Sequence, residues 1–283
     1  MQIELQSFLP VASQFKAVFL DSYGVLKNYK GLIDGAQNIV MALKEKGIAV
    51  RILTNDASRS QEQQVESFNK LGLHGLQTTE VITSGMMAKH FLQHKITSGK
   101  IGYMGTENSA RYILQAGLEH ISIRDIDMEQ LDDVSAFVFL DDEGFDWNTD
   151  INKTINLLRV KNIPVIVANS DKLYPVSKNE VSVATGGIAR LVENSVGKKF
   201  IHFGKPDTQM FTYAYNRLKR LMPVTKPDIL MVGDNLHTDI LGGNKFGVKT
   251  ALVLSGNTSE KSFEQQISST GIIPDFVCRS ITA

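Results

Sequence analysis

Short, largely apolar runs alternate with amphipathic segments along almost the whole chain. Residues 48–53 form one such run, and a continuous apolar run of this length is typical of a strand buried on both faces. Residues 33–46 are amphipathic, because Ile39, Val40 and Leu43 recur at helical spacing. The alternation predicts an α/β fold, with a parallel sheet covered by helices on both faces.

The predicted elements fall into an early, a middle and a late group. We predict strands over residues 16–20, 48–53, 101–104, 136–140, 164–168, 199–203, 229–232 and 250–254, and helices over residues 33–46, 107–116, 148–160 and 208–221. The motifs described below lie only in the early and late groups. We therefore expect residues 96–196 to be an α/β domain inserted into a core made of residues 1–95 and 197–283.

Composition restricts the class of protein. The chain has 283 residues, 42% of them hydrophobic, and its 30 basic residues balance its 30 acidic residues. A formal net charge of zero argues against nucleic acid as the main partner. With one cysteine, no signal peptide and no apolar run near the ~20 residues of a membrane span, we expect a cytoplasmic protein without a membrane partner.

Two segments place a polar side chain at the end of an early predicted strand. Residues 19–26 read FLDSYGVL, in which Asp21 ends the strand. A carboxylate there can attack phosphorus, although an Asp that only caps a turn is the simpler interpretation. Residues 52–55 read ILTN, in which the Thr54 hydroxyl can donate to a phosphate oxygen or merely bond the next turn.

Two further segments follow late predicted strands. Residues 203–206 read FGKP, where Lys205 is either a cation that neutralises phosphate or a solvated surface lysine. Residues 231–240 read MVGDNLHTDI, where Asp234 and Asp239 offer the hard oxygen ligands that Mg²⁺ prefers. An Asp-Asn turn is the structural alternative for this segment.

Together, the four segments place a nucleophile, a hydroxyl donor, a cation and a carboxylate pair at four strand ends of one predicted sheet. Ligands of open α/β sheets bind at the carboxyl ends of strands, and phosphoryl transfer needs this set of groups. The sequence therefore predicts a phosphoryl-transfer site.

In order, the four segments resemble the four motifs of the haloacid dehalogenase (HAD) superfamily, and most closely subclass IIA, the NagD-like and nitrophenylphosphatase-like branch. The stretches that carry the resemblance are TN (54–55), FGKP (203–206), GDNLHTDILGG (233–243) and LVLSG (252–256). VANSD (167–171) also resembles the branch's Asn-Pro-Asp loop, with Ser170 in place of Pro. The resemblance implies a Rossmann-like core with an α/β cap inserted between the second and third motifs.

The resemblance also implies a role for each site residue. Asp21 would be the nucleophile, and Mg²⁺ would be held by Asp21, Asp234 and the main-chain carbonyl of Tyr23. Asp239 would support the metal shell. The phosphoryl group would be bound by Thr54, Asn55 and Lys205, and the cap residues that face the substrate would be Asn169 and Asp171.

One position departs from the family pattern. The family usually has a general acid/base Asp two residues after the nucleophile, where this chain has Tyr23. A phenol with a pKa near ~10 can donate a proton but is a poor base at neutral pH. Loss of acid/base assistance typically costs ~10²–10⁴ in rate, so this residue bears directly on activity.

Four other side chains are candidates for a function. His90 and His94 have the spacing of a zinc pair on a helix, but no further ligand lies nearby in sequence, so we interpret them as a solvated face. We interpret Cys278 as a packing residue. Trp147, beside Phe145, is interpreted as cap core or a dimer contact rather than a substrate platform, and the sequence leaves this choice open.

The leading hypothesis is a Mg²⁺-dependent phosphatase that acts on a small phosphorylated metabolite, a sugar phosphate by family analogy, through an aspartyl-phosphate intermediate. The alternative is a weakly active or inactive binding or regulatory protein on the same scaffold, as Tyr23 suggests. A third hypothesis is cleavage of a phosphonate or phosphoanhydride. Cap-mediated homodimers occur in this branch, so a homodimer is one expectation, and the sequence leaves the oligomeric state open.

Overall fold

The computed structural model describes residues 3–177 and 180–283. The chain divides into two compact units, which we call the first and second units. The first unit consists of Met1–Thr54, Gln61–Ile82 and Lys205–Ala283, and the second of Asn55–Ser60 and Thr83–Gly204. Among the described residues, we find no helix whose length and apolar content would suffice to cross a membrane.

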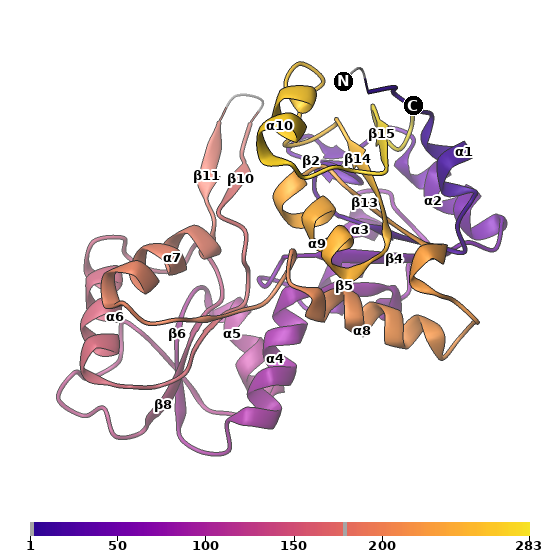
Figure 1. Cartoon of the computed structure of the whole chain (residues 1–283). Coiled ribbons are helices and arrows are strands. Elements are labelled where there is room, and N and C mark those ends of the chain that lie inside the picture. The colour runs from indigo at the N-terminus through magenta and orange to yellow at the C-terminus, as the bar shows by residue number, and fades with distance from the viewer. Residues whose placement is uncertain (1–2, 178–179) are drawn as a thin grey trace. The chain divides into compact units, whose positions relative to one another are not determined.

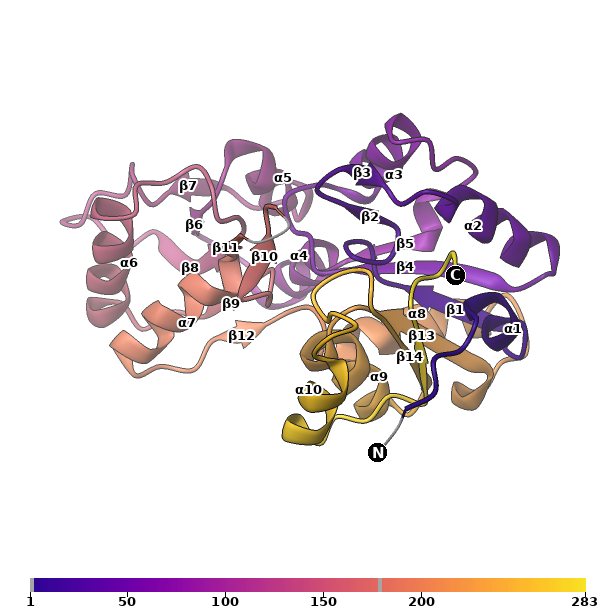
Figure 2. The same cartoon turned by 90° about the horizontal axis from the view of Figure 1, so that it is seen from above.

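The first unit is built on a six-stranded sheet in the order β15-β14-β13-β1-β4-β5 (Figures 1 and 2). The strands are β1 (Ala17–Leu20), β4 (Ala49–Thr54), β5 (Val81–Thr83), β13 (Ile229–Gly233), β14 (Lys249–Val253) and β15 (Phe276–Cys278). All pairings from β15 to β4 are parallel. This arrangement confirms the predicted α/β fold class with a Rossmann-like core.

Helices cover both faces of this sheet because its strands are apolar on both sides. On one face, Val18 and Leu20 of β1 share a buried cluster with Leu43 of α2. On the other face, Leu252 of β14 packs in a cluster with Phe263 of α10. The helices of this unit are α1 (Phe8–Ala12), α2 (Ala36–Glu45), α3 (Gln61–Lys70), α8 (Thr208–Lys219), α9 (Leu241–Phe246) and α10 (Phe263–Thr270).

Short elements complete the first unit. They are the β2 (Lys27–Asn28) and β3 (Gly31–Leu32) hairpin, the 3₁₀ turns η1 (Thr78–Glu80) and η2 (Lys226–Asp228), and the π-helical turn η3 (Leu236–Ile240). The turn η3 lies between β13 and α9, so it follows directly on the end of a central strand of the sheet.

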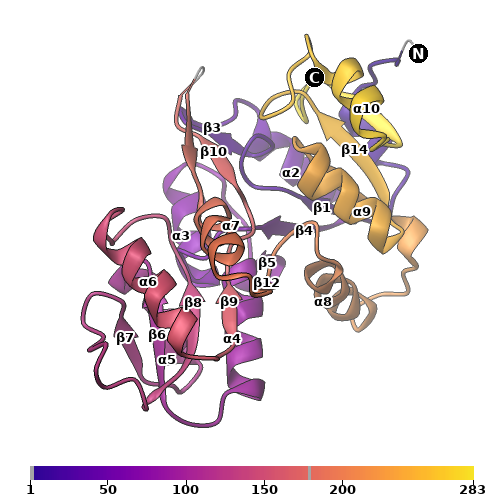
Figure 3. The same ribbon diagram turned by 60° about the vertical axis from the view of Figure 1, so that its left-hand side comes forward.

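The second unit has its own five-stranded parallel sheet, in the order β12-β9-β8-β6-β7 (Figure 3). Its elements are α4 (Ser84–Lys95), β6 (Lys100–Met104), α5 (Glu107–Gln115), β7 (His120–Ser122), β8 (Val134–Phe139), α6 (Thr149–Val160), β9 (Val165–Val167), α7 (Thr185–Val196) and β12 (Ile201–His202). The antiparallel hairpin of β10 (Leu173–Pro175) and β11 (Val181–Val183) projects away from this sheet.

Alternate residues of β8 face opposite sides of the second sheet. Phe137 and Phe139 pack in a cluster with residues of α6 and α7, whereas Ala136 and Val138 pack with residues of α4 and α5. The strand is therefore buried on both faces, as its continuous apolar run predicts.

One predicted strand pairs in a different sheet from the one expected. The run at residues 199–203 was expected in the same sheet as the other late strands, but β12 pairs with β9 of the second unit. The prediction that Asp21, Thr54, Lys205 and the late Asp pair follow four strands of one sheet is therefore wrong for Lys205. An apolar run indicates that a strand is buried. It does not indicate which other strand this one pairs with, because pairing depends on long-range packing.

The side chains that were assigned no catalytic or binding role from the sequence lie outside the cluster of predicted site residues. His94 Nδ1 lies 2.7 Å from the carbonyl of His90 within α4. Cys278 is fully buried in the core of the first unit, as expected for a packing residue. Trp147 is 52% exposed, with its ring 5.8 Å from that of Phe145, so its interpretation as a core side chain is wrong.

Candidate functional site

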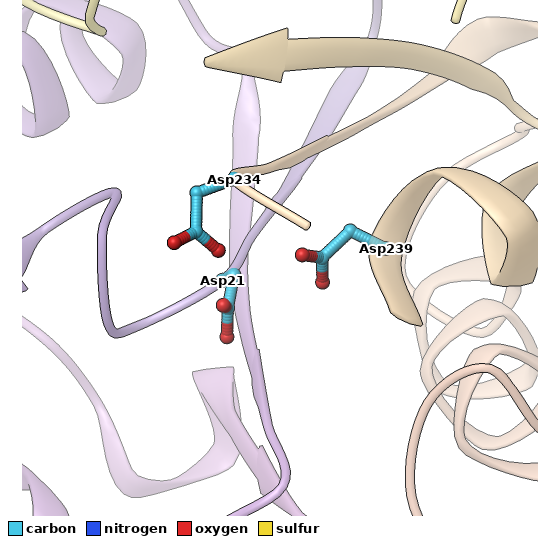
Figure 4. Close-up of side chains that lie close together, drawn as sticks. All are labelled: Asp21, Asp234 and Asp239. Carbon is cyan, nitrogen blue, oxygen red and sulfur yellow. The ribbon is translucent and has the colours of Figure 1, made fainter. Parts of the chain in front are cut away.

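Three carboxylates converge at the ends of the two central strands of the first unit. Asp21 directly follows β1 and Asp234 directly follows β13, which pair in parallel, and the Asp21 amide donates to the carbonyl of Val232 at 2.9 Å. Asp239 reaches the same place from η3. One oxygen of each carboxylate lies within 4.8 Å of the others, and Figure 4 shows the three side chains turned toward one another.

Lys205 lies among these carboxylates in the first unit. Its Nζ is 2.6 Å from Asp21 Oδ1 and 2.7 Å from Asp239 Oδ1, and the side chain is only 2% exposed. Burial by itself would lower the pKa of Lys205, but Asp21 and Asp239 more than offset it and hold the pKa above its ordinary value. The ammonium is therefore a fixed, oriented positive charge.

Asp234 is buried, and its surroundings disfavour the charged form of its carboxyl group. Burial raises its pKa well above the ordinary value, and the charges of Asp21 and Asp239 raise it further. Gly24, at φ 78°, passes so close to this side chain that a Cβ on it would lie 2.1 Å from Asp234 Oδ2. Only glycine fits at position 24.

This set of donors fits a magnesium ion. When all three carboxylates are ionised, as metal binding requires, they and the one ammonium carry a net charge of about −2, which a divalent cation would neutralise. All the candidate side-chain ligand atoms are carboxylate oxygens, the hard donors that Mg²⁺ prefers. The raised pKa of Asp234 is the effect expected where this charge is uncompensated.

Tyr23 can hold a proton at this site but is ill suited to accept one. It is half-buried, and burial, with the charge of Asp234 next in weight, raises its pKa above 10.0. The phenol is therefore protonated at neutral pH, as expected from the sequence. The chain at this point is held by the Ser255 hydroxyl, which donates to the carbonyl of Gly24 at 2.6 Å.

The predicted phosphate-binding and substrate-binding residues are divided between the two units. Thr54 ends β4, the neighbour of β1 on the side opposite β13, and is buried in the first unit. Asn55 belongs to the second unit, where its Nδ2 donates to Asp171 Oδ1 at 2.9 Å. Asn169 Oδ1 accepts from the Asp171 amide at 2.9 Å, so Asn55, Asn169 and Asp171 form one polar network.

Two groups of polar residues that the structure places at strand ends or beside the carboxylates were not identified from the sequence. Asn257, which directly follows the LVLSG stretch (252–256), contacts Asp234 from the loop after β14. Asp141 and Asp142 follow β8 in the second unit, where Asp141 accepts a hydrogen bond from Thr106 Oγ1 at 3.0 Å. Their position at a strand end is the same signal that identified Asp21.

Lys205→Met is expected to destabilise the fold strongly. Removing the ammonium leaves the buried Asp239 and the largely buried Asp21 without their cation, and breaking a buried ion pair in this way costs about 3–5 kcal/mol. Urea unfolding at neutral pH without divalent cations measures the effect. Lys249→Met is the matched control, because its 2.6 Å pair with Asp275 is half exposed and is worth at most about 1 kcal/mol. Equal losses in the two variants would contradict the account.

Asp141→Asn is expected to change how stability depends on pH. Burial raises the pKa of Asp141 from 3.8 to about 6, against the opposing hydrogen bond from Thr106. Between these two values the folded protein holds a proton that the unfolded chain has released, so wild-type stability falls as pH rises through this window. The variant cannot titrate there.

From about pH 4 to about pH 7, Asp141→Asn should therefore gain about 1–3 kcal/mol in unfolding free energy relative to wild type. Asp133→Asn makes the same chemical change at a mostly exposed side chain and serves as the control. Urea unfolding curves across this pH range provide the measurement. A constant difference between Asp141→Asn and wild type at all pH values would show that the folded carboxyl is ionised throughout.

The sequence of this chain is similar to two family models and to curated proteins along most of its length. A family model described as haloacid dehalogenase-like hydrolase matches residues 18–119, and one described as HAD-hydrolase-like matches residues 202–283. Bovine chronophin is 26% identical over 278 residues, which cover 96% of this chain and 92% of chronophin.

Two solved structures of similar fold cover 98% or more of the chain. A possible sugar phosphatase of the HAD superfamily from Cytophaga hutchinsonii is 48% identical, with a TM-score of 0.96 and coverage of 100% of this chain and 99% of that one. The glycerol phosphate phosphatase Rv1692 of Mycobacterium tuberculosis, solved in complex with magnesium, is 22% identical, with a TM-score of 0.75 and coverage of 98% and 78%. At this lower identity, the second likeness concerns the fold alone.

Proposed function

Because the chain belongs to the haloacid dehalogenase-like hydrolases and is a phosphoric monoester hydrolase of that family, we propose that it is a Mg²⁺-dependent phosphatase acting on a small phosphorylated metabolite. The observation that carries the proposal is the cluster of Asp21, Asp234 and Asp239 around the buried Lys205. A sugar phosphate is the proposed class of substrate, by analogy with the 48% identical protein.

Asp21 is the proposed nucleophile. Its Oδ1 accepts from Lys205 Nζ at 2.6 Å and from the Ser22 amide at 2.7 Å, while no described residue is hydrogen-bonded to Oδ2. This second oxygen is the one that would attack phosphorus. The ester P–O bond then breaks, the phosphoryl group is carried by Asp21 as an aspartyl-phosphate, and water hydrolyses it to release phosphate and the free carboxylate.

Lys205 and Thr54 act on the phosphoryl group in this proposal. The Lys205 ammonium orients Asp21 and neutralises charge that builds up on the phosphoryl oxygens, and the Thr54 hydroxyl donates to one of them. Asp21, Asp234 and the carbonyl of Tyr23 would hold Mg²⁺, supported by Asp239, and the bound ion would neutralise further phosphoryl charge. The Tyr23 phenol can protonate a leaving oxygen, but it cannot serve as a base that activates water.

The second unit is proposed to be the family's cap, with the inserted segment at residues 96–196. Its network of Asn55, Asn169 and Asp171 supplies donors and acceptors of the kind that bind the non-reacting part of a metabolite. A cap that closes over substrate excludes water during the reaction.

Turnover of p-nitrophenyl phosphate with and without Mg²⁺ tests the proposed function. We expect hydrolysis that requires Mg²⁺, is abolished by excess EDTA and returns when Mg²⁺ is restored. A panel of sugar phosphates and other phosphate esters then defines the substrate class. If no ester is hydrolysed in the presence of Mg²⁺ by protein that still binds phosphate, the alternative of a binding or regulatory protein on this scaffold is favoured.

A further inference from the structure

The loop that follows β14 holds the carboxylate of Asp234 in place. Asn257 approaches Asp234 Oδ2 with two donors: its backbone amide at 2.6 Å and its side-chain Nδ2 at 3.0 Å. The next residue, Thr258, donates its amide to the main-chain carbonyl of Asp234 at 3.1 Å. The loop is therefore hydrogen-bonded to both the side chain and the backbone of Asp234.

The same loop also holds the segment that follows the proposed nucleophile. The Ser255 hydroxyl donates to the carbonyl of Gly24 at 2.6 Å. A Cβ on Gly256 would lie 1.9 Å from Asp234 Oδ2, so the loop can approach the carboxylate this closely only with glycine at position 256. Residues 255–258 thus connect the two chain segments, after β1 and after β13, whose residues are the proposed metal ligands.

The contacts of Asn257 all fall on one oxygen of Asp234. Two donors on Oδ2 restrict the rotation of the carboxylate. Hydrogen bonds from N–H groups to an ionised carboxylate are short and strong, and they favour the charged form that a cation requires. Groups that orient metal ligands in this way typically contribute 10–100-fold to metal affinity.

We propose that Asn257 is a positioning residue for the metal site: it holds Asp234 in the orientation that binds Mg²⁺, and it does not itself contact substrate. The inference rests on the proposed function in so far as Asp234 is taken as a metal ligand. It assigns a role to a residue outside the four motif segments.

Asn257→Ala tests the inference, because it removes the Nδ2 donor and leaves the backbone amide. Asn257 is exposed, so the change should cost the fold little. Isothermal titration with Mg²⁺ alone should show about tenfold weaker binding than wild type. Mg²⁺ should also raise the unfolding temperature of the variant less than that of wild type. Asn257→Ser, which keeps a donor on a shorter side chain, should fall between the two.

The matched control is Asn244→Ala. Asn244 is also an exposed asparagine of the first unit, and its Nδ2 donates to the carbonyl of Ile273 at 2.9 Å, away from the carboxylates. Its loss should leave the Mg²⁺ affinity at the wild-type value. In p-nitrophenyl phosphate hydrolysis, Asn257→Ala should need about tenfold more Mg²⁺ for half-maximal rate and reach a near wild-type rate when Mg²⁺ saturates.

The outcomes separate this inference from the proposed function. Wild-type Mg²⁺ affinity in Asn257→Ala, with phosphatase activity intact, overturns the inference alone. Weaker Mg²⁺ binding in the variant of a protein that hydrolyses no phosphate ester supports the inference and contradicts the proposed function. Absence of Mg²⁺ binding by the wild-type protein overturns both, and a rate defect that saturating Mg²⁺ does not restore overturns the assignment of Asn257 to positioning.

Discussion

Asp21→Asn is expected to lower phosphatase turnover by about 10⁴-fold or more, the scale seen when a catalytic nucleophile is removed. The amide has the shape of the carboxylate but cannot attack phosphorus to form the acyl phosphate. Lys205 keeps its 2.7 Å pair with Asp239, and the repulsion among the three clustered carboxylates is reduced. The variant should therefore fold at least as stably as wild type while losing activity.

Steady-state hydrolysis of p-nitrophenyl phosphate at saturating Mg²⁺, together with urea unfolding of the same preparations, measures both effects. Asp133→Asn, the same replacement at a side chain that is 78% exposed, should keep the wild-type rate. If Asp21→Asn retains the wild-type rate with any substrate that the protein hydrolyses well, then Asp21 is not the nucleophile.

Tyr23 is expected to make the rate depend steeply on the leaving group. Because the phenol pKa is raised by burial and by Asp234, Tyr23 is a weak proton donor and a poor base. Aryl phosphates, acyl phosphates and phosphoanhydrides have leaving groups that depart unaided, so their first step can proceed. Hydrolysis of the aspartyl-phosphate should then be slow, giving a burst and a low steady-state rate with p-nitrophenyl phosphate and a much lower rate with alkyl phosphates.

Tyr23→Asp restores the acid/base group usual in the family, and we expect it to raise turnover of alkyl phosphates by about 10²–10⁴-fold. Tyr23→Phe is the control, because it removes the hydroxyl and adds no acid. Rates with a series of phosphate esters of increasing leaving-group pKa measure the effect. Fast wild-type hydrolysis of an unactivated sugar phosphate would agree with the proposed substrate class but contradict this limiting role of Tyr23, and it would show that another group supplies the proton.

Asp56 is the first residue to test in that event. It lies two residues after Thr54, and its Oδ1 accepts from both the amide and the hydroxyl of Ser58 at 2.7 Å. Asp56→Asn should leave the rate unchanged if Asp56 only stabilises its own loop.

Much of the fold could be predicted because its strands and helices are locally encoded. Residues 33–46 predict a helix that the structure has at α2 (Ala36–Glu45), and residues 229–232 predict a strand that it has at β13 (Ile229–Gly233). The hairpin of β10 and β11 was missed, since its strands are three residues each and too short to show a period. The sheet to which β12 belongs was predicted wrongly, because strand pairing is set by long-range packing.

The convergence of Asp21 and Asp234 was predictable, because each follows a buried strand and neighbouring parallel strands end at the same edge of a sheet. The contacts of Asn257 were not, since they depend on how the loop after β14 closes over Asp234. The raised pKa of Asp141 could not be predicted either. It comes mainly from burial of the carboxyl group, and the residues around Asp141 in the sequence do not indicate that burial.

Mapping the phosphoryl group on the enzyme during turnover tests the central claim most directly. The protein is mixed with p-nitrophenyl phosphate and Mg²⁺, quenched with acid within the first turnovers, digested and analysed by mass spectrometry. We predict phosphate on the peptide that contains Asp21 and none in Asp21→Asn. Because Tyr23 is a poor base, this phosphoenzyme should accumulate. Sustained release of phosphate with no label on Asp21, or with label on another residue, would contradict the account.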